Sequence, residues 1–435
     1  MPYKNEFAFR RAMNFIPGGA HTYSKGSDQY PENAPPIIDY GKGCHLWDLD
    51  GGRYTDLAMS LGTVILGHAY EPILSAVRDE LTRGVNFCRP SVIEGELAEL
   101  IVNTIPSAEM VKFGKNGSDA VTAAVKLARA YTGRDYIVRC QDDAFNSIHD
   151  WFIGSTIMTR GIPKAVQDLT LQFKYNDLSS CKELFEKYPG QIACVILEPL
   201  SFEAPKENFL ESLKLLCEKN GALLIFDEVV SGFRFSLGGA QEVVNVMPHL
   251  SAFGKAMANG FSVSALVGQR EFMKLGGIDH NQERVFLLST THGGETHSLA
   301  AAIACINEIK KTDAINHFWS TGGDLMNKVN AAALDVGAEK YVKCFGFGVK
   351  PAFAFMDETG AASPVARTLF MQETIARGLL MPYVVPSLAH TERDINFSVD
   401  CIRESLLVMK RAAEGAGMLA AINGNVIKPV FRKFN

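Results

Sequence analysis

The chain has 435 residues, and its composition of 47% hydrophobic and 21% charged residues is that of a folded globular protein with more than one domain, which excludes a disordered, collagen-like or coiled-coil chain. The formal net charge of −5 and the lack of a basic stripe argue against nucleic-acid binding. The nine cysteines include no Cys-x-x-Cys pair, which is typical of free thiols in a reducing compartment. The sequence shows no signal peptide and no apolar run near the roughly 18 residues of a membrane span. We therefore predict a cytoplasmic protein that enters no membrane.

The chain begins with a predicted helix and continues in short strands. Apolar residues recur at helical spacing over residues 6–15. Further along, Asp50-Gly51-Gly52 predicts a tight turn between two strand-like pieces. From about residue 62 the pattern changes, because helical segments alternate with short apolar runs. The predicted helices span residues 71–83, 92–103 and 117–131, and the apolar runs span residues 136–139, 193–197 and 222–226.

Two of these runs indicate the type of sheet. Ile192-Ala-Cys-Val-Ile-Leu and Ala222-Leu-Leu-Ile-Phe are apolar without alternation, which is typical of parallel strands buried on both faces. Helical spacing over residues 207–218 between them completes a βαβ unit. After about residue 325 come helical stretches and short strands, ending in a long amphipathic helix at residues 395–414.

We therefore predict an α/β protein whose large domain has a central, mostly parallel sheet flanked by helices. This domain is expected to span residues 62–324. The N-terminal segment, residues 1–61, and a C-terminal α+β part, residues 325–435, are expected to form a smaller domain.

An acidic residue and a lysine stand out in the large domain. Asp227 ends a buried strand, at the edge where open α/β sheets bind ligands, and a carboxylate there can hold a cofactor's ring nitrogen in its cationic form. Lys255 lies among apolar and small residues, where desolvation favours a neutral, nucleophilic amine. The spacing leaves room for one crossover and one strand, so both residues are expected around one pocket. Taken alone, Asp227 also suits a strand-end cap, and Lys255 a surface lysine that extends its amine into water.

Two polar loops contain candidate phosphate ligands. Gly117 and Ser118 open a predicted helix, where backbone N–H groups, a glycine and a hydroxyl form a phosphate cradle, with an ordinary helix cap as the alternative. Thr291, in a polar loop before a helix of small residues, is a second candidate donor. His292 and His297 match no common zinc spacing, so no metal site is predicted.

Together these motifs resemble the class III, fold-type I family of pyridoxal-phosphate enzymes, and within it the glutamate-1-semialdehyde 2,1-aminomutases and their aminotransferase relatives. The most specific stretch is Asp227-Glu-Val-Val-Ser-Gly-Phe-Arg followed by Gly238-Gly-Ala-Gln. Phe253-Gly-Lys-Ala is similar to the family's lysine motif, and Ile16-Pro-Gly-Gly and Ile65-Leu-Gly-His also match in the family's order. The likeness extends over nearly the whole chain.

The resemblance implies pyridoxal 5'-phosphate as cofactor and assigns roles to the matching residues. Lys255 would form the Schiff base with the cofactor and later move the proton, and Asp227 would pair with the pyridine nitrogen. Thr291 matches a threonine that reaches the cofactor phosphate from the neighbouring subunit, which implies a homodimer with shared active sites. The other implied cofactor contacts are Gly117, Ser118, Phe145, Glu198 and Val229.

Three departures from the family concern the substrate. Asn146 stands where the family usually has histidine, Lys25 where the aminomutases have an arginine for the substrate carboxylate, and Leu61 where they have tryptophan. Lysine cannot form the bidentate fork of a guanidinium. Thr22, Lys25 and Asn146 are the candidate substrate-binding residues, suited to a sugar-like or anionic group.

The leading hypothesis is an aminotransferase that moves an amino group from an amine donor to an aldehyde or ketone acceptor. The nearest alternative is an intramolecular glutamate-1-semialdehyde 2,1-aminomutase, which would use the same residues. A protein of this fold without turnover, serving as a binding or assembly module, is a third hypothesis, and the intact pair of Lys255 and Asp227 argues against it.

Overall fold

A computed structural model describes residues 4–434, and it contains two compact units. Unit 1 comprises the chain up to Tyr70 together with Asn316–Arg432, and unit 2 comprises Glu71–Ile315 with the last residues from Lys433. The chain leaves unit 2 inside one long helix, α13 (Ala314–Val336). The domain boundaries predicted from the sequence, after residues 61 and 324, are close to these but not the same.

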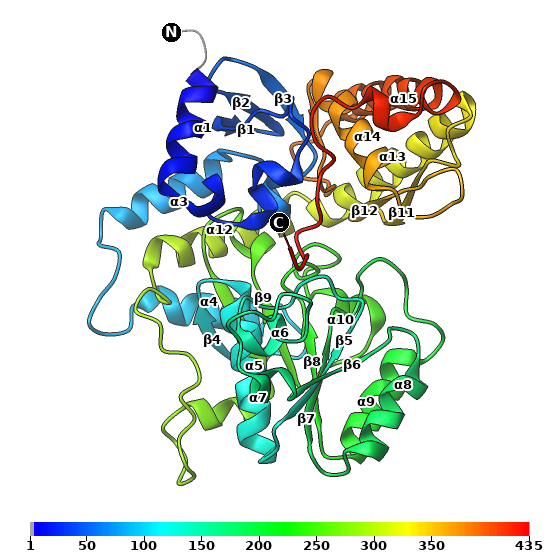
Figure 1. Ribbon diagram of the computed structural model, residues 1–435. Coiled ribbons are helices and arrows are strands. Elements are labelled where there is room, and N and C mark those ends of the chain that lie inside the picture. The colour runs from blue at the N-terminus through cyan, green and yellow to red at the C-terminus, as the bar shows by residue number, and fades with distance from the viewer. Residues whose placement is uncertain (1–3, 435) are drawn as a thin grey trace. The chain divides into compact units, whose positions relative to one another are not determined.

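A seven-stranded sheet forms the centre of unit 2, in the order β4-β10-β9-β8-β7-β5-β6 (Figure 1). Strand β10 is antiparallel to both of its neighbours, β4 and β9, and the remaining pairs are parallel. The mostly parallel sheet predicted from the sequence is therefore confirmed. The strands are β4 (Met110–Gly114), β5 (Tyr136–Cys140), β6 (Thr170–Phe173), β7 (Ile192–Leu197), β8 (Leu223–Asp227), β9 (Leu250–Phe253) and β10 (Ser264–Gly268).

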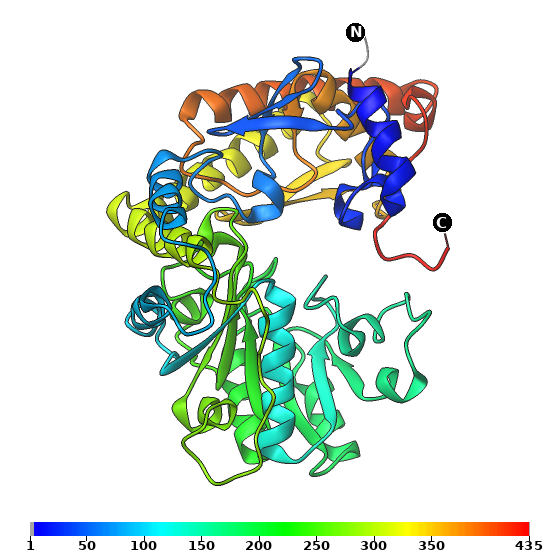
Figure 2. The same cartoon turned by 90° about the vertical axis from the view of Figure 1, so that its left-hand side faces the viewer.

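Helices cover both faces of this sheet. Helix α5 packs across β10, β9, β8 and β7 and runs beside them in Figure 2. Helices α8 and α9 lie side by side and share a core with the strands through Phe185, Leu213 and Cys217. The helices of unit 2 are α3 (Glu71–Leu81), α4 (Val92–Val102), α5 (Gly117–Thr132), α6 (Asp150–Ile153), α7 (Lys164–Gln167), α8 (Leu178–Lys187), α9 (Phe209–Lys219), α10 (Ala240–Val244), α11 (Arg270–Met273) and α12 (Thr296–Lys311), with 3₁₀ turns η4 (Lys255–Ala258) and η5 (Lys274–Gly276).

The apolar runs of the sequence form the central strands for the expected reason. Every residue of β7 and of β8 is buried, as a parallel strand covered by helices on both faces requires. Helix α9 lies between them in sequence and completes the βαβ unit. Between Asp227 and Lys255 the chain adds α10 and β9, so the expected crossover and strand are both present.

Unit 1 combines two small sheets with long helices. Its larger sheet has the order β1-β2-β3-β13, in which β13 is parallel to β3, and β11 and β12 form a hairpin. Apolar side chains of α13, α14, α15 and β11 form one core. The elements are α1 (Lys4–Phe15), β1 (Ile38–Lys42), β2 (His45–Asp48), β3 (Arg53–Asp56), α2 (Met59–Gly62), β11 (Val342–Phe347), β12 (Lys350–Phe355), α14 (Pro364–Ala376), β13 (Leu379–Leu380) and α15 (Glu392–Glu414), with 3₁₀ turns η1 (Pro17–Gly19), η2 (Tyr23–Lys25), η3 (Ser27–Gln29) and η6 (Met418–Ala421).

Two features of the described residues concern membrane spans and cysteines. Among residues 4–434, no helix is both long and apolar enough to cross a bilayer. All nine cysteines are free thiols, of which Cys88 is exposed and the others are buried.

Candidate active site

Four neighbouring strands of the unit 2 sheet end in ionisable side chains at one edge. Strands β9, β8, β7 and β5 are adjacent and parallel, so their carboxyl ends meet at the same side of the sheet. Asp227 is the last residue of β8, Lys255 follows β9, and Glu198 follows β7. Asp143, three residues after β5, completes the row. The sheet order thus brings together the residues that the sequence pointed to, and adds Asp143, which sequence analysis missed.

Asp227 is buried, with 3% of its surface exposed, and is held in a fixed orientation. Its Oδ1 accepts a hydrogen bond from the backbone N–H of Val229 at 3.1 Å, and its Oδ2 accepts one from Asn146 Nδ2 at 3.0 Å. Burial, followed by the charge of Glu198, raises the pKa of Asp227 to about 7, although these two hydrogen bonds and the charge of Lys255 oppose the rise. The carboxylate is therefore placed where a further cation would hold it ionised.

A second buried carboxylate lies beside this group. Asp143 Oδ2 accepts a hydrogen bond from the backbone N–H of Glu198 at 2.9 Å. Burial and the neighbouring charge of Glu198 raise the pKa of Asp143 well above its usual value. This edge of the sheet consequently has an excess of buried acidic groups, which favours a cationic ligand.

Glu228, the next residue after Asp227, has a different task. It is completely buried, and its carboxylate accepts hydrogen bonds from the N–H groups of Ala240 and Gln241, both at 2.8 Å, and from the Ser231 hydroxyl. These bonds fasten the start of α10 to the end of β8. Of the two adjacent acids of the motif, Glu228 therefore has a structural position and Asp227 ends β8 at the edge of the sheet.

Lys255 has an uncommon backbone conformation. Its φ of 43° lies in the left-handed region, which costs a non-glycine residue free energy and is found most often at functional sites. The three residues that follow it in η4 are buried and apolar, as the sequence predicted. The lysine itself is half-buried, and its charge acts on Asp227.

The loop before α5 lies at the same edge of the sheet. Gly114, at the end of β4, pairs with Ser264 of β10, whose next residue, Ala265, pairs with Phe253 of β9. An Asn116–Asp119 capping box then begins the helix. A Cβ added to Gly117 would lie 2.6 Å from Val229 Cγ1, so only glycine permits this close approach.

Ser118 is oriented by a neighbouring loop. Its hydroxyl oxygen accepts a hydrogen bond from the N–H of Ile148 at 3.1 Å, and the residue is buried. A hydroxyl that accepts one bond can still donate its own hydrogen. Together with the N–H groups of the first turn of α5, this donor suits an anion such as phosphate.

Of the other predicted site residues, Phe145 and Thr291 belong to unit 2, and Thr22 and Lys25 belong to unit 1. Phe145 is 43% exposed and meets Phe152 edge to face at 5.6 Å. Thr291 is exposed, and its carbonyl oxygen accepts a hydrogen bond from Asn86 Nδ2 at 2.9 Å. Thr22 and Lys25 belong to unit 1, where Lys25 is exposed and its N–H bonds to the carbonyl of Thr22 at 3.1 Å.

Both a family pattern and a known relative match most of the chain. The sequence pattern of the family described as aminotransferase class-III matches residues 27–342. A glutamate-1-semialdehyde 2,1-aminomutase of Syntrophobacter fumaroxidans is 32% identical over 435 residues, covering 94% of this chain and 98% of the relative.

Two solved structures extend the comparison to the fold. The internal aldimine form of the Sphingopyxis sp. MTA144 FumI protein, which contains PLP, has a TM-score of 0.85 and 26% identity, covering 94% of this chain and 97% of that one. An omega-transaminase from Sphaerobacter thermophilus has a TM-score of 0.82 and 26% identity, covering 93% and 97%.

The raised pKa of Asp227 predicts a pH dependence of stability for the protein freed of bound small molecules. Because the folded-state pKa of about 7 exceeds the ordinary aspartate value of 3.8, the contribution of Asp227 to the free energy of unfolding is complete below about pH 4 and is lost as the pH rises to about 7. Asp227→Asn removes this loss. We expect urea denaturation to show that the free energy of unfolding of the variant, relative to that of the parent, rises by about 1.4 kcal/mol per pH unit over this range, a few kcal/mol in all. The same change at exposed Asp150 is the control, and parallel pH profiles for parent and Asp227→Asn would contradict the prediction.

Proposed function

The chain belongs to the class III aminotransferases, and on that premise we propose that it is a pyridoxal-phosphate-dependent aminotransferase. It moves an amino group from a small-molecule amine donor to an aldehyde or ketone acceptor. The observation that carries this proposal is that Asp227 and Lys255 lie at the ends of adjacent strands, where the lysine's charge acts on a buried carboxylate whose pKa is raised to about 7.

The residues at this edge fit the cofactor on three counts. The ring nitrogen of pyridoxal phosphate is a cation when protonated, which the buried acidic group requires. The amide oxygen of Asn146 is buried and has no hydrogen-bond partner among residues 4–434, so the pocket retains an acceptor for a ligand. Gly117 and Ser118 provide a helix N-terminus and a hydroxyl for the phosphate.

The cofactor, when bound, supplies an electron sink for the carbanion that forms at the α-carbon of the substrate. The protein holds the ring and moves the proton. Ionised Asp227 would stabilise the protonated ring nitrogen, and Val229, which lies against Gly117, would contact the ring. Lys255 Nζ would hold the cofactor by its amine and would serve as the base that takes up and returns the proton of the substrate carbon next to nitrogen.

Asn146 is best explained as a partner of Asp227. The sequence suggested a substrate contact, but the side chain is 3% exposed and donates to Asp227 Oδ2. We therefore assign it to fixing this carboxylate, in the position where the family usually has an imidazole. An amide is neutral at every physiological pH, so, unlike an imidazole, Asn146 donates this hydrogen bond without any change in its own protonation.

Three further parts of the proposal concern assembly, location and substrate. Exposed Thr291 is proposed to contact the cofactor phosphate of a second subunit in a homodimer, which light scattering would show as twice 47.6 kDa. The buried free thiols suit the reducing cytoplasm. Thr22 and Lys25 are proposed to contact a sugar-like or anionic acceptor.

Replacing the lysine tests the covalent role directly. Lys255→Ala is expected to lose both turnover and the bond to pyridoxal phosphate that borohydride reduces, because no amine remains at the end of β9. The exposed lysine of β4, changed as Lys112→Ala, is the control and should retain both. If mass spectrometry of borohydride-reduced Lys255→Ala located pyridoxal phosphate bonded to another residue, the assignment would be overturned.

A second prediction separates transferase from mutase. Lys25 orients a carboxylate less well than an arginine, so the protein should not isomerise glutamate 1-semialdehyde efficiently. The assay measures 5-aminolevulinate, and Lys25→Arg should raise whatever rate is present. A kcat/KM of roughly 10⁴ M⁻¹s⁻¹ or more would contradict the prediction and favour the aminomutase alternative.

A further inference from the structure

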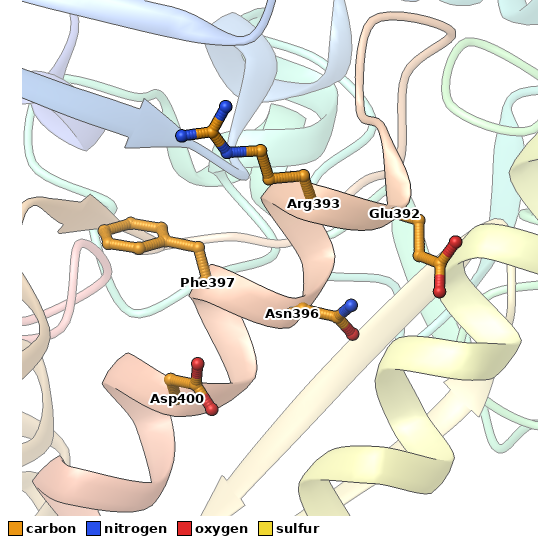
Figure 3. Close-up of a pocket in the computed structure, with 5 residues that line it drawn as sticks. All are labelled: Glu392, Arg393, Asn396, Phe397 and Asp400. Atoms are coloured by element: carbon orange, nitrogen blue, oxygen red, sulfur yellow. The ribbon is translucent and has the colours of Figure 1, made fainter.

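Unit 1 contains a pocket whose lining is rich in arginine. The cavity has a volume of about 510 Å³, within the range of small-molecule sites. A shallower depression of about 490 Å³ continues from it along the first turns of α15 and shares two of its residues, Arg393 and Phe397. Figure 3 shows these two side chains extending to the same side of the helix. The pocket is lined by His45, Arg53, Thr55, Arg377, Gly378, Thr391, Arg393, Asp394 and Phe397.

Three separate elements bring the arginines together. Strand β13 lies parallel to β3 with Leu379 opposite Thr55, and the N–H of Thr55 donates to the carbonyl of Gly378 at 2.8 Å. This pairing sets Arg377, at the end of α14, against Arg53 of β3. Arg393 extends from the first turn of α15. The arrangement is a consequence of the sheet order and not of neighbouring positions in the sequence.

The positive charge of the pocket is only partly compensated. Arg377 Nη1 pairs with Glu373 at 2.8 Å, whereas Arg393 forms no ion pair within residues 4–434. Asp394 is the one carboxylate in the lining, and its Oδ2 accepts hydrogen bonds from the N–H and hydroxyl of Thr391 at 2.9 and 2.6 Å. The adjoining depression adds the carboxylates of Glu392 and Asp400, whereas in the pocket itself three guanidinium groups share the lining with one carboxylate, Asp394, which already caps the helix.

The same place offers a set of possible metal ligands, but a cation does not suit it. Atoms of Cys44, His45 and Asp394 lie within 4.8 Å of one another. Arg53 Nη2, however, lies 2.8 Å from His45 Nε2, so a guanidinium occupies the position that a metal would need. Burial and the charge of Asp394 also raise the pKa of the Cys44 thiol to about 12, which disfavours a thiolate.

We propose that this pocket binds a small molecule through a carboxylate or phosphate group, with Arg53, Arg377 and Arg393 as the donors. Guanidinium groups present paired N–H donors that match the oxygens of either group. The Phe397 ring gives the pocket an apolar wall for the rest of the ligand. Every lining residue belongs to unit 1, whereas Lys255 and Asp227 belong to unit 2, and the proposal does not depend on the proposed function.

Calorimetric titration of the cofactor-loaded protein tests this, because the loaded form has its phosphate cradle filled. Inorganic phosphate and succinate are the two probes, each at constant ionic strength. We expect saturable binding of at least one probe with a Kd of about 1 mM or lower, and the preferred probe identifies the group that the site recognises. Arg393→Gln should weaken this binding about tenfold or more.

Arg403→Gln is the matched control. Arg403 lies on the same helix, outside the pocket, where it pairs with Asp335 at 2.8 Å. Each variant removes one arginine, so Arg403→Gln and Arg393→Gln have the same net charge. It should leave the Kd unchanged. Equal losses in both variants, or no saturable binding of either probe, would overturn the proposal.

Asp394→Asn distinguishes an anion site from a cation site. Removing the carboxylate while keeping a helix-capping amide should strengthen binding of the anion severalfold. Thermal unfolding of each variant checks that it is folded. Weaker anion binding in Asp394→Asn, or tight binding of Zn²⁺ by the parent that this variant abolishes, would contradict the assignment.

Discussion

The carboxylate of Asp227 is buried where ionisation costs free energy, although its proposed role requires the ionised form. Much of unit 2 is arranged around this group. Burial and the charge of Glu198 push Asp227 towards its neutral form, with a pKa of about 7. The hydrogen bonds from Asn146 and Val229 and the charge of Lys255 act in the opposite direction without fully compensating. A cationic ligand would offset the remaining imbalance, and in the proposed function this links cofactor binding to the charge of Asp227.

The geometry of the sheet makes this arrangement possible. Adjacent parallel strands align their carboxyl ends, which sets Lys255, Asp227 and Glu198 in a row without any of them being close in sequence. Glu228 secures the end of β8 through α10, so the neighbouring Asp227 can face the ligand. Gly117 lets the loop before α5 approach Val229, so the proposed ring and phosphate contacts lie at one edge of the sheet.

Much of this could be predicted from the sequence, because the signals are local. The unbroken apolar runs of β7 and β8 indicate parallel strands, and the residues that follow them point to the site. Asn146 and Asp227 are 81 residues apart, and their hydrogen bond depends on how a loop folds over the sheet edge, which no periodicity reveals. The pocket of unit 1 is still less accessible to sequence reasoning, since it depends on β13, a strand of two residues, to bring Arg53 next to Arg377.

The linkage between the charge of Asp227 and the cofactor can be measured most directly by ¹³C NMR. Aspartate labelled at its carboxyl carbon, with the Asp227 signal assigned by its disappearance in Asp227→Asn, reports the pKa of this one group in the protein with and without pyridoxal phosphate. We expect the Asp227 carboxyl to titrate near pH 7 in the empty protein, and its pKa to fall to the ordinary range or lower when the cofactor is bound. An Asp227 signal that titrates at the same pH in both forms would contradict this linkage.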